Sequence, residues 1–427
     1  MALETYRYDA EKCVKCKGCT WVDHIYMPNI RHGIKCPSIA KYLFDAYSPH
    51  GRLNLAVALL DGEIDCSPKL LDIIYTCQLC GACDVGCKRN LDLEPLLVLE
   101  GLREKCVRDG KGPMPEHKKV ADNIENSKNR YGASPDKRRQ WLPEEVSLTD
   151  KADLLYFAGC ASSYLYPDLS QATARILSSA NTGFAILSNE WCCGHPLFET
   201  GQLAAAGKIV EHNMEAIKKS GAHIVITSCA ECYKTLKVDY PKALGISTDD
   251  LGFRVVHVVE YIKELMDNDR LKLIRRIDIK IAYHDACNLG RLSEPWVHWE
   301  GKRKKYGILD PPKEYRRGTH GIYNQPRDIL RAIPGVELVE MDRAKENAWC
   351  CGAGGGVREA FKDFAQWTAA ERLEEAEAAG AEAIVSSCPY CRENLRDAVS
   401  SGKEKLAIYD ITEIVLKAIS PQGGISQ

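Results

Sequence analysis

The hydrophobic pattern changes about a third of the way along the chain. From residue 151 onward, short apolar runs alternate with amphipathic stretches, which is typical of βαβ units built on parallel sheets. The predicted buried strands are 152–159, 222–228, 280–285 and 381–387, and the clearest helices are 202–221 and 358–380. A cysteine follows each strand closely. Because functional groups collect at the carboxyl ends of parallel strands, these cysteines are candidate site residues.

The region from residue 151 also has an internal repeat. Both halves run strand, cysteine, helix, strand, Cys-Cys-Gly, helix, strand, Cys-x-x-Cys, helix. A period of about 120 residues is too long for a solenoid and indicates a duplicated domain. The second copy carries an extra stretch at 294–322, rich in Trp, Lys, Pro and Arg. We expect two related sites that face each other across a pseudo-twofold axis.

The first 150 residues lack this alternation of strands and helices. Residues 1–110 mix helical stretches with two tight cysteine groups, and 111–150 is a polar, proline-punctuated segment with one predicted helix at 115–127. The expected domains are therefore a helical unit (1–110), a linker (111–150) and two copies of the α/β unit (151–275 and 276–427).

Composition narrows the class of protein. The chain has 427 residues, 27% of them charged, and a net charge of −2, which gives no reason to expect nucleic acid or an anionic membrane as a partner. The basic runs at 302–305 and 137–139 are interpreted as solvated faces or docking patches. No apolar run is long enough to span a bilayer, and the first residues contain no apolar signal core. We expect a cytoplasmic protein from a cell with little oxygen, with a partner as the only route to a membrane.

Twenty cysteines in such a chain argue for metal ligation, because the cytosol keeps thiols reduced. The run Cys77, Cys80, Cys83 and Cys87 has the spacing of bacterial ferredoxins, with Lys88 in place of the usual proline. A second group consists of Cys13, Cys16, Cys19 and, after a long gap that contains His24 and His32, Cys36.

Crossed ligation, as in two-cluster ferredoxins, would divide these eight cysteines between two [4Fe-4S] cubes. One cube would take Cys13, Cys16, Cys19 and Cys87, and the other Cys77, Cys80, Cys83 and Cys36. The alternative is a pair of zinc knuckles, since Cys-x-x-Cys pairs also bind zinc. Zinc does not require the third cysteine of each run, so we favour the ferredoxin interpretation.

Each repeated block offers five thiols, one more than an ordinary cube uses. The first block has Cys160, Cys192, Cys193, Cys229 and Cys232, and the second has Cys287, Cys350, Cys351, Cys388 and Cys391. Adjacent cysteines can reach one centre only if the backbone turns between or after them, and Gly194 and Gly352 can supply that turn.

With these blocks, the chain resembles the CCG-domain proteins, whose type members are the two catalytic iron–sulfur subunits of heterodisulfide reductase. The segments that support this resemblance include HDACNLGR (284–291), ENAWCCGAGGG (346–356) and SPHGRLNLAVALLDGEI (48–64). The fused N-terminus is similar to the D subunit of that enzyme and to the iron–sulfur subunits of glycolate, lactate and glycerol-3-phosphate oxidoreductases. Departures are the 294–322 insertion, the long gap before Cys36, Lys88, and Gly-His-Pro at 194–196.

The resemblance implies two noncubane [4Fe-4S] clusters at the CCG motifs, fed by the two cubes, and an oxidoreductase subunit that splits a disulfide between them. The alternative is a non-catalytic relay in a larger anaerobic complex, such as class II benzoyl-CoA reductase. The implied partners are a flavoprotein, ferredoxin, hydrogenase or membrane cytochrome. Any flavin or nicotinamide would belong to another subunit.

Several residues outside these sets have more than one interpretation. His284 and His195 are candidate proton donors, although a structural role is at least as good an interpretation. Glu231 is expected to face solvent. The glycines 354–356 favour packing near a cluster over phosphate binding. Cys66 and Cys106, outside all four groups, are expected to be buried structural thiols.

Overall fold

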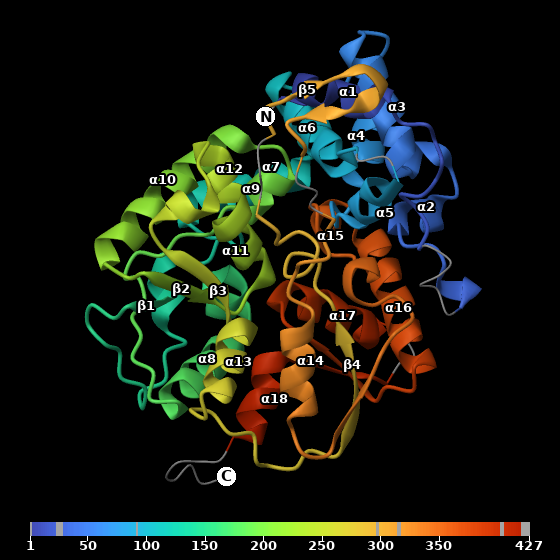
Figure 1. Cartoon of the computed structure of the whole chain (residues 1–427). Helices are drawn as coiled ribbons and strands as arrows, with labels where there is room; N and C mark the ends of the chain where they lie inside the picture. Colours follow the sequence, from blue (N-terminus) through green and yellow to red (C-terminus); the bar gives the residue numbers. More distant parts are fainter. Residues whose placement is uncertain are drawn as a thin grey trace.

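The computed structural model describes residues 2–22, 29–90, 93–295, 299–313, 317–401 and 405–419. The chain forms three parts (Figure 1): a helical N-terminal part, a first α/β unit and a second α/β unit. The N-terminal helices are α1 (Arg7–Glu11), α2 (Pro37–Tyr42), α3 (Pro49–Leu60), α4 (Pro68–Tyr75), α5 (Ala82–Asn90), α6 (Pro95–Arg108) and α7 (Pro115–Ser127). Helix α7 coincides with the helix predicted at 115–127.

Proline and serine define where several of these helices begin. Pro49 and Pro68 occupy the first turns of α3 and α4, where a missing N–H costs nothing. The preceding Ser48 and Ser67 accept hydrogen bonds from the backbone N–H groups of Gly51 and Leu70. The helices pack around their own core, built largely from α3, α4 and α6.

The first α/β unit contains a three-stranded parallel sheet in the order β1-β2-β3. Its elements are β1 (Leu154–Tyr156), α8 (Pro167–Ser179), α9 (His195–Glu199), α10 (Leu203–Ser220), β2 (Ile224–Thr227), α11 (Ala230–Lys234), α12 (Tyr240–Leu244), β3 (Arg254–His257) and α13 (Val258–Asp267). Residue Ala185 pairs in parallel with Leu155, so a rudimentary fourth strand flanks β1.

The second unit has a four-stranded parallel sheet in the order β7-β4-β8-β9. Its elements are β4 (Ile279–His284), β5 (Lys302–Arg303), β6 (Leu309–Asp310), α14 (Asn324–Arg331), β7 (Val336–Val339), α15 (Val357–Ala360), α16 (Lys362–Ala378), β8 (Ala383–Ser386), α17 (Pro389–Ser401), β9 (Ala407–Asp410) and α18 (Ile411–Ala418). Strand β7 corresponds to the Ala185 bridge, so the two units share one topology. The predicted α/β class with parallel sheets and a repeat is confirmed.

The two units pack with approximate twofold symmetry. Helix α8 contacts α18, and its counterpart α14 contacts α13, which is the counterpart of α18. Both units contribute to one continuous hydrophobic core. Each predicted strand lies where it was expected, and the carboxyl end of β4 points toward the junction of the three parts (Figure 1).

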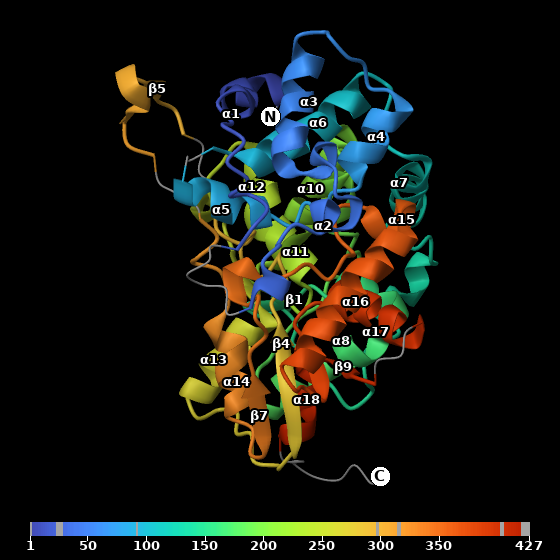
Figure 2. The same cartoon turned by 90° about the vertical axis from the view of Figure 1, so that its right-hand side faces the viewer.

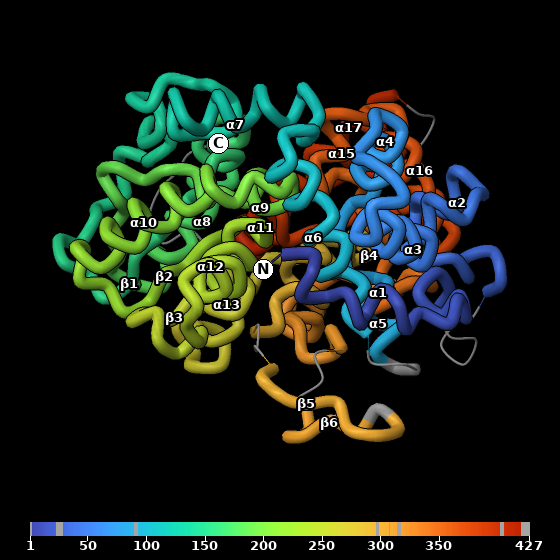
Figure 3. Tube along the Cα trace, turned by 90° about the horizontal axis from the view of Figure 1, so that it is seen from above, coloured from blue at the N-terminus to red at the C-terminus, as the bar shows by residue number. Residues whose placement is uncertain are grey.

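The stretch 299–313 forms a small antiparallel hairpin from β5 and β6, which projects from the body of the molecule (Figure 3). It rests on the N-terminal part, where Arg303 lies 4.0 Å from the centre of the Tyr8 ring. No helix in the described part of the chain is both long and apolar enough to cross a membrane.

Candidate metal centres

The two ferredoxin-type runs fold into loops of the same backbone shape. Positive φ angles occur two and four residues after the first cysteine of each run, at Lys15 (55°), Lys17 (63°), Leu79 (47°) and Gly81 (73°). A non-glycine residue in this region costs about 1 to 2 kcal/mol. Two loops that share such an unfavourable shape are built to turn their thiols toward a common point, which fits a cluster that the loop wraps around.

Thiols of the two groups lie close to one another. Burial and the nearby Asp84, Cys19 and Cys13 raise the pKa of Cys87, and Cys36 lies near both Cys77 and Cys19. Burial raises the pKa of the Cys19 thiol to about 12. Thiolates crowded into such a site need a cation to stabilise them, so the residues present fit a metal cluster.

A buried lysine sits between the two groups. The ammonium of Lys35 is 1% exposed and lies near Cys83, Cys19 and Cys36. Burial lowers its pKa to about 8. A cation at this point stabilises negative charge on either side, and sequence reasoning overlooked it.

Lys88, the departure from the ferredoxin pattern, has a structural explanation. Its ammonium is buried and pairs with Asp84 at 3.1 Å and with Glu94 at 2.7 Å. Glu94 also pairs with Lys313. The 294–322 insertion is thereby anchored to the end of the cysteine-rich helix α5.

In the two repeated blocks, the sulfur atoms contact one another in the same order. The series in the first block is Cys160, Cys192, Cys193, Cys232, Cys229. The series in the second block is Cys287, Cys350, Cys351, Cys391, Cys388. The ten thiols, which come from strand ends and intervening turns, therefore form two equivalent series of five neighbouring sulfur atoms.

The glycine after each cysteine pair makes the same turn. Gly194 has φ 88° and Gly352 has φ 93°. Each glycine N–H donates to the first sulfur of the pair, at 3.4 Å to Cys192 and 3.3 Å to Cys350. A Cβ on Gly352 would lie 2.4 Å from the carbonyl oxygen of Ala365, so no side chain fits there.

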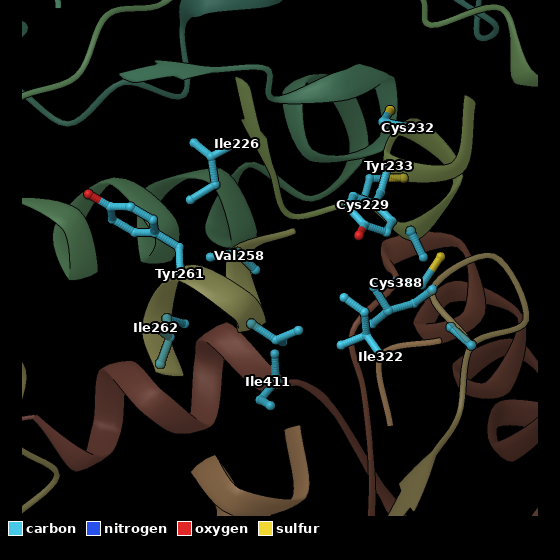
Figure 4. Packing of buried hydrophobic residues seen from close by; sticks show 14 of the residues in the cluster. Ile226, Cys229, Cys232, Tyr233, Val258, Tyr261, Ile262, Ile322, Cys388 and Ile411 are labelled. Carbon is cyan, nitrogen blue, oxygen red and sulfur yellow. The ribbon is translucent and has the colours of Figure 1, made fainter. Parts of the chain in front are cut away.

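The two series of thiols contact each other, and the second series also contacts the N-terminal part. Cys229 of the first block contacts Cys388, its equivalent in the second block, close to the pseudo-twofold axis (Figure 4). Cys350, which lies next to Cys287 in the second series, contacts Cys80 of the ferredoxin-type run. The thiols thus form a continuous series from the N-terminal part, through the second block, to the first.

The predicted linker contributes two buried arginines to the first block. Arg138 places its guanidinium 3.8 Å from the Cys160 sulfur and 2.8 Å from a Glu190 oxygen. Arg130 donates to Glu231 at 2.9 Å. The prediction that Glu231 faces solvent is wrong, because the side chain is 5% exposed and forms this ion pair instead. Burial raises its pKa to about 8.

His195 is fully enclosed beside the first block. Its Nδ1 lies 2.9 Å from the Thr235 hydroxyl, and its Nε2 lies 3.2 Å from Glu199 and 3.3 Å from Asn288. Burial would lower its pKa, but Glu199 and Glu231 outweigh that effect and raise it to about 9. It has the partners of a charged, hydrogen-bonded residue.

His284 distinguishes the second block from the first. A ligand nitrogen of His284 and the sulfurs of Cys351 and Cys391 all lie within 4.8 Å of one another, and Arg372 donates to Nδ1 at 3.2 Å. The equivalent residue in the first block is Phe157. The two centres therefore have different surroundings, and His284 is a further potential metal ligand.

Arg103 joins all three parts. Its guanidinium is 1% exposed and donates to four carbonyl oxygens, those of Ile74 (3.0 Å), Cys77 (2.6 Å), Glu199 (2.7 Å) and Gly355 (2.6 Å). A Cβ on Gly355 would lie 2.4 Å from the Cys77 carbonyl oxygen. The glycines at 354–356 thus allow close packing against the Cys77 loop, which accounts for them without a phosphate-binding role.

A cavity of about 250 Å³ opens where the three parts meet. Its lining includes His195, Glu199, Lys234 and Asn288 together with residues of α6. None of its described lining residues comes from the 294–322 insertion. The cavity borders the first block at His195, two residues after Cys193.

The two cysteines outside the four groups lie together. Cys66 and Cys106 were expected to be separate thiols, which is wrong: they form a disulfide that ties α6 to the segment before α4. Two neighbouring elements bring them together, which spacing alone could not show. Of the histidines in the long gap before Cys36, His32 is buried and contacts Asp342 at 2.6 Å, while His24 lies outside the described residues.

The repeated blocks match a known domain family. The cysteine-rich CCG domain family matches residues 154–237 and 314–396. The first match contains all five cysteines of its block, whereas the second begins after Cys287.

Relatives cover nearly the full length. The chain is 32% identical to the D subunit of the dihydromethanophenazine:CoB–CoM heterodisulfide reductase of Methanosarcina mazei, over 96% of this chain and 94% of that protein. It is 28% identical to the B subunit of fumarate reductase (CoM/CoB) from Methanothermobacter marburgensis, over 81% of this chain and 62% of that one. It is also 28% identical to the EtfAB:quinone oxidoreductase of Syntrophomonas wolfei, over 82% of this chain and 47% of that protein. An aspartate racemase homologue from Pyrococcus horikoshii shares 11% identity over 62% of this chain and 96% of that one, with a TM-score of 0.23, too low to indicate a common fold.

Proposed function

Because the chain belongs to the family of the heterodisulfide reductase D subunit and related iron–sulfur electron-transfer subunits, we propose that it is the disulfide-reducing subunit of a redox complex. The observation that carries the proposal is the continuous series of thiols from Cys80, through Cys350 and Cys388, to Cys229. Two cubes at the N-terminal groups and two noncubane clusters at the CCG blocks would supply one-electron carriers along it.

The residues of the chain perform separate tasks in this scheme. The two N-terminal cysteine groups would receive the electrons. Arg103 holds the Cys77 loop against both α/β units. Each CCG block contributes five thiols, on opposite sides of the pseudo-twofold axis. The overall reaction is RSSR′ + 2e⁻ + 2H⁺ → RSH + R′SH, with the electrons supplied singly by a protein donor.

The cavity favours a catalytic role over a pure relay. A relay needs close spacing of its centres but no space for a small molecule. Here a cavity of about 250 Å³ reaches His195, which lies two residues after Cys193. His195 and Glu199 lie 3.2 Å apart at the cavity wall and would hold a proton there in the proposed reaction.

A relay subunit is the second candidate. The 28% identity to the EtfAB:quinone oxidoreductase, over less than half of that protein, supports electron transfer between separate partners. A relay would use the same thiol series but would release electrons to another subunit.

The test is to reduce the anaerobic protein with reduced methyl viologen and supply low-molecular-weight disulfides. We expect release of two thiols per disulfide, and a new paramagnetic state on partial oxidation in the presence of a thiol. Cys193→Ser and Cys351→Ser should abolish thiol release, whereas the matched double variant Cys66→Ala/Cys106→Ala, outside the four groups, should retain it. Reduction of the protein without any thiol release or thiol-dependent signal would favour the relay.

A further inference from the structure

The surface around Cys16 combines exposed thiol, apolar and basic groups. Cys16 is exposed, whereas the other seventeen cysteines outside the disulfide, all within the described residues, are buried or partly buried. Three apolar side chains of the same region are unusually exposed for their type: Val14 is 65% exposed, Leu43 80% and Phe44 65%. A cluster of large apolar side chains in solvent marks an interaction site.

One ion pair brings the segment after α2 to the loop that carries Val14. Lys17 pairs with Asp45 at 3.8 Å, which holds the segment after α2 against the Cys13–Cys19 loop. Asp45 also lies 3.6 Å from His50, whose other ring nitrogen is 3.9 Å from the Cys19 sulfur. Leu43 and Phe44 directly precede Asp45 and therefore lie beside the same cysteine group.

The backbone holds this surface at a cost. Leu43 ends α2 with φ 52°, a conformation that is unfavourable for a leucine by about 1 to 2 kcal/mol. Its side chain gains no burial in return, because it is 80% exposed. Both costs are offset if the side chain becomes buried against another molecule.

Exposed basic residues flank Val14 on its loop. Lys12, Lys15 and Lys17 are all exposed on the loop that carries Cys13 and Cys16. The β5–β6 hairpin, which projects from the molecule in Figure 2, adds the exposed Lys302 and Lys305. Its Arg303 reaches the ring of Tyr8 and approaches Asp9 at 3.9 Å.

We propose that this surface, made of Val14, Leu43 and Phe44 with the lysines at 12, 15 and 17, docks a small acidic one-electron carrier protein. The proposal rests on the proposed function, because it assigns the Cys13–Cys19 group as the point of electron entry. The carrier loses one electron and that group gains it, with no bond made or broken. A second copy of the chain is a poor occupant, since two lysine-rimmed faces repel each other. A few apolar contacts within a charged rim suit a weak, rapidly exchanging complex.

The experiment measures the rate at which the cluster-loaded protein is reduced by two donors under anaerobic conditions. One donor is a reduced bacterial ferredoxin of net negative charge, and the other is the methyl viologen radical cation. The variant is Lys12→Glu/Lys15→Glu. The matched control is Lys118→Glu/Lys119→Glu, two exposed lysines on α7, which lies on the opposite side of the molecule from the hairpin in Figure 3.

We expect Lys12→Glu/Lys15→Glu to lower the second-order rate constant with ferredoxin by at least about tenfold at low salt and to reduce its salt dependence. The rate with the viologen cation should stay equal or rise, which also shows that the variant is folded. Leu43→Gln should slow ferredoxin alone, with little change in salt dependence. Equal ferredoxin rates for variant and control would overturn the docking surface, as would lysine-dependent dimers of the free protein. If neither donor reduces the wild-type protein, the proposed function fails instead.

Discussion

The contact between Arg138 and Cys160 leads to a quantitative prediction for the first CCG centre. The guanidinium lies 3.8 Å from the sulfur, and both groups are buried. Coulomb's law with an effective dielectric constant of about 20 gives about 4 kcal/mol for unit charges at this separation. Because the charge added on reduction spreads over the whole centre, we take roughly a quarter to a half of this, about 1 to 2 kcal/mol, or about 45 to 90 mV for one electron.

Removing the cation should therefore make reduction harder. We expect Arg138→Gln to lower the midpoint potential of the first CCG centre by about 45 to 90 mV. Glu190, which pairs with Arg138 at 2.8 Å, provides the matched control. Glu190→Gln should raise the same potential, and the double variant should return close to wild type. A redox titration monitored by electron paramagnetic resonance separates the centres.

Only the first CCG centre should respond to this change. The second block has other cations beside it, with Arg291 near Cys350 and Arg372 bonded to His284. Its potential should move by less than about 15 mV in Arg138→Gln, given the screening of charges at longer range. A shift of equal size in every centre, or no shift in any, would refute the assignment of Arg138 to the first block.

Three further predictions concern stability. Gly352→Ala should cost at least about 2 kcal/mol, because of its positive φ and the contact with the Ala365 oxygen. Gly207→Ala, where a Cβ would meet nothing beyond its own helix within 4 Å, should be neutral or slightly stabilising, and chemical denaturation measures both. Burial raises the pKa of Asp410, the N-cap of α18, to about 7. Between about pH 4 and pH 7 the folded state therefore binds a proton that the unfolded state does not, so the free energy of unfolding falls as the pH rises through this range. Asp410→Asn keeps the cap and should remove this slope, raising stability at pH 8 by up to about 4 kcal/mol; unchanged slopes of the denaturation midpoint with pH would contradict it. Arg103→Met leaves four carbonyl groups unpaired and should cost about 3 to 5 kcal/mol and expose the junction to proteolysis, with partial recovery in Arg103→Lys.

The sequence predicted the parts of the fold that depend on short-range patterns. Apolar runs located β1, β2, β4 and β8, since buried parallel strands are nearly continuous in hydrophobic residues. The repeat of cysteine spacings predicted the shared topology of the two units. Strand β5 and its partner β6 were not predicted, because two-residue strands leave no periodic signal.

The charged surroundings of the candidate centres could not be predicted. Arg138 and Arg130 come from a polar stretch that resembles a linker, and they become buried only because the fold supplies Glu190 and Glu231 as partners. The same lack of long-range information led to the wrong prediction for Glu231. A lone charged residue beside a cysteine carries no sequence signal that separates a solvated side chain from a buried ion pair.

The central claim is that the eighteen cysteines outside the disulfide hold four clusters in one continuous series. The most direct measurement is iron and acid-labile sulfide per chain after anaerobic purification, together with electron paramagnetic resonance of the reduced and oxidised protein. We predict about 16 iron atoms per chain, with two cubane signals and two of different type. About eight iron atoms with cubane signals alone would contradict the account, because the ten thiols of the CCG blocks would then hold no clusters.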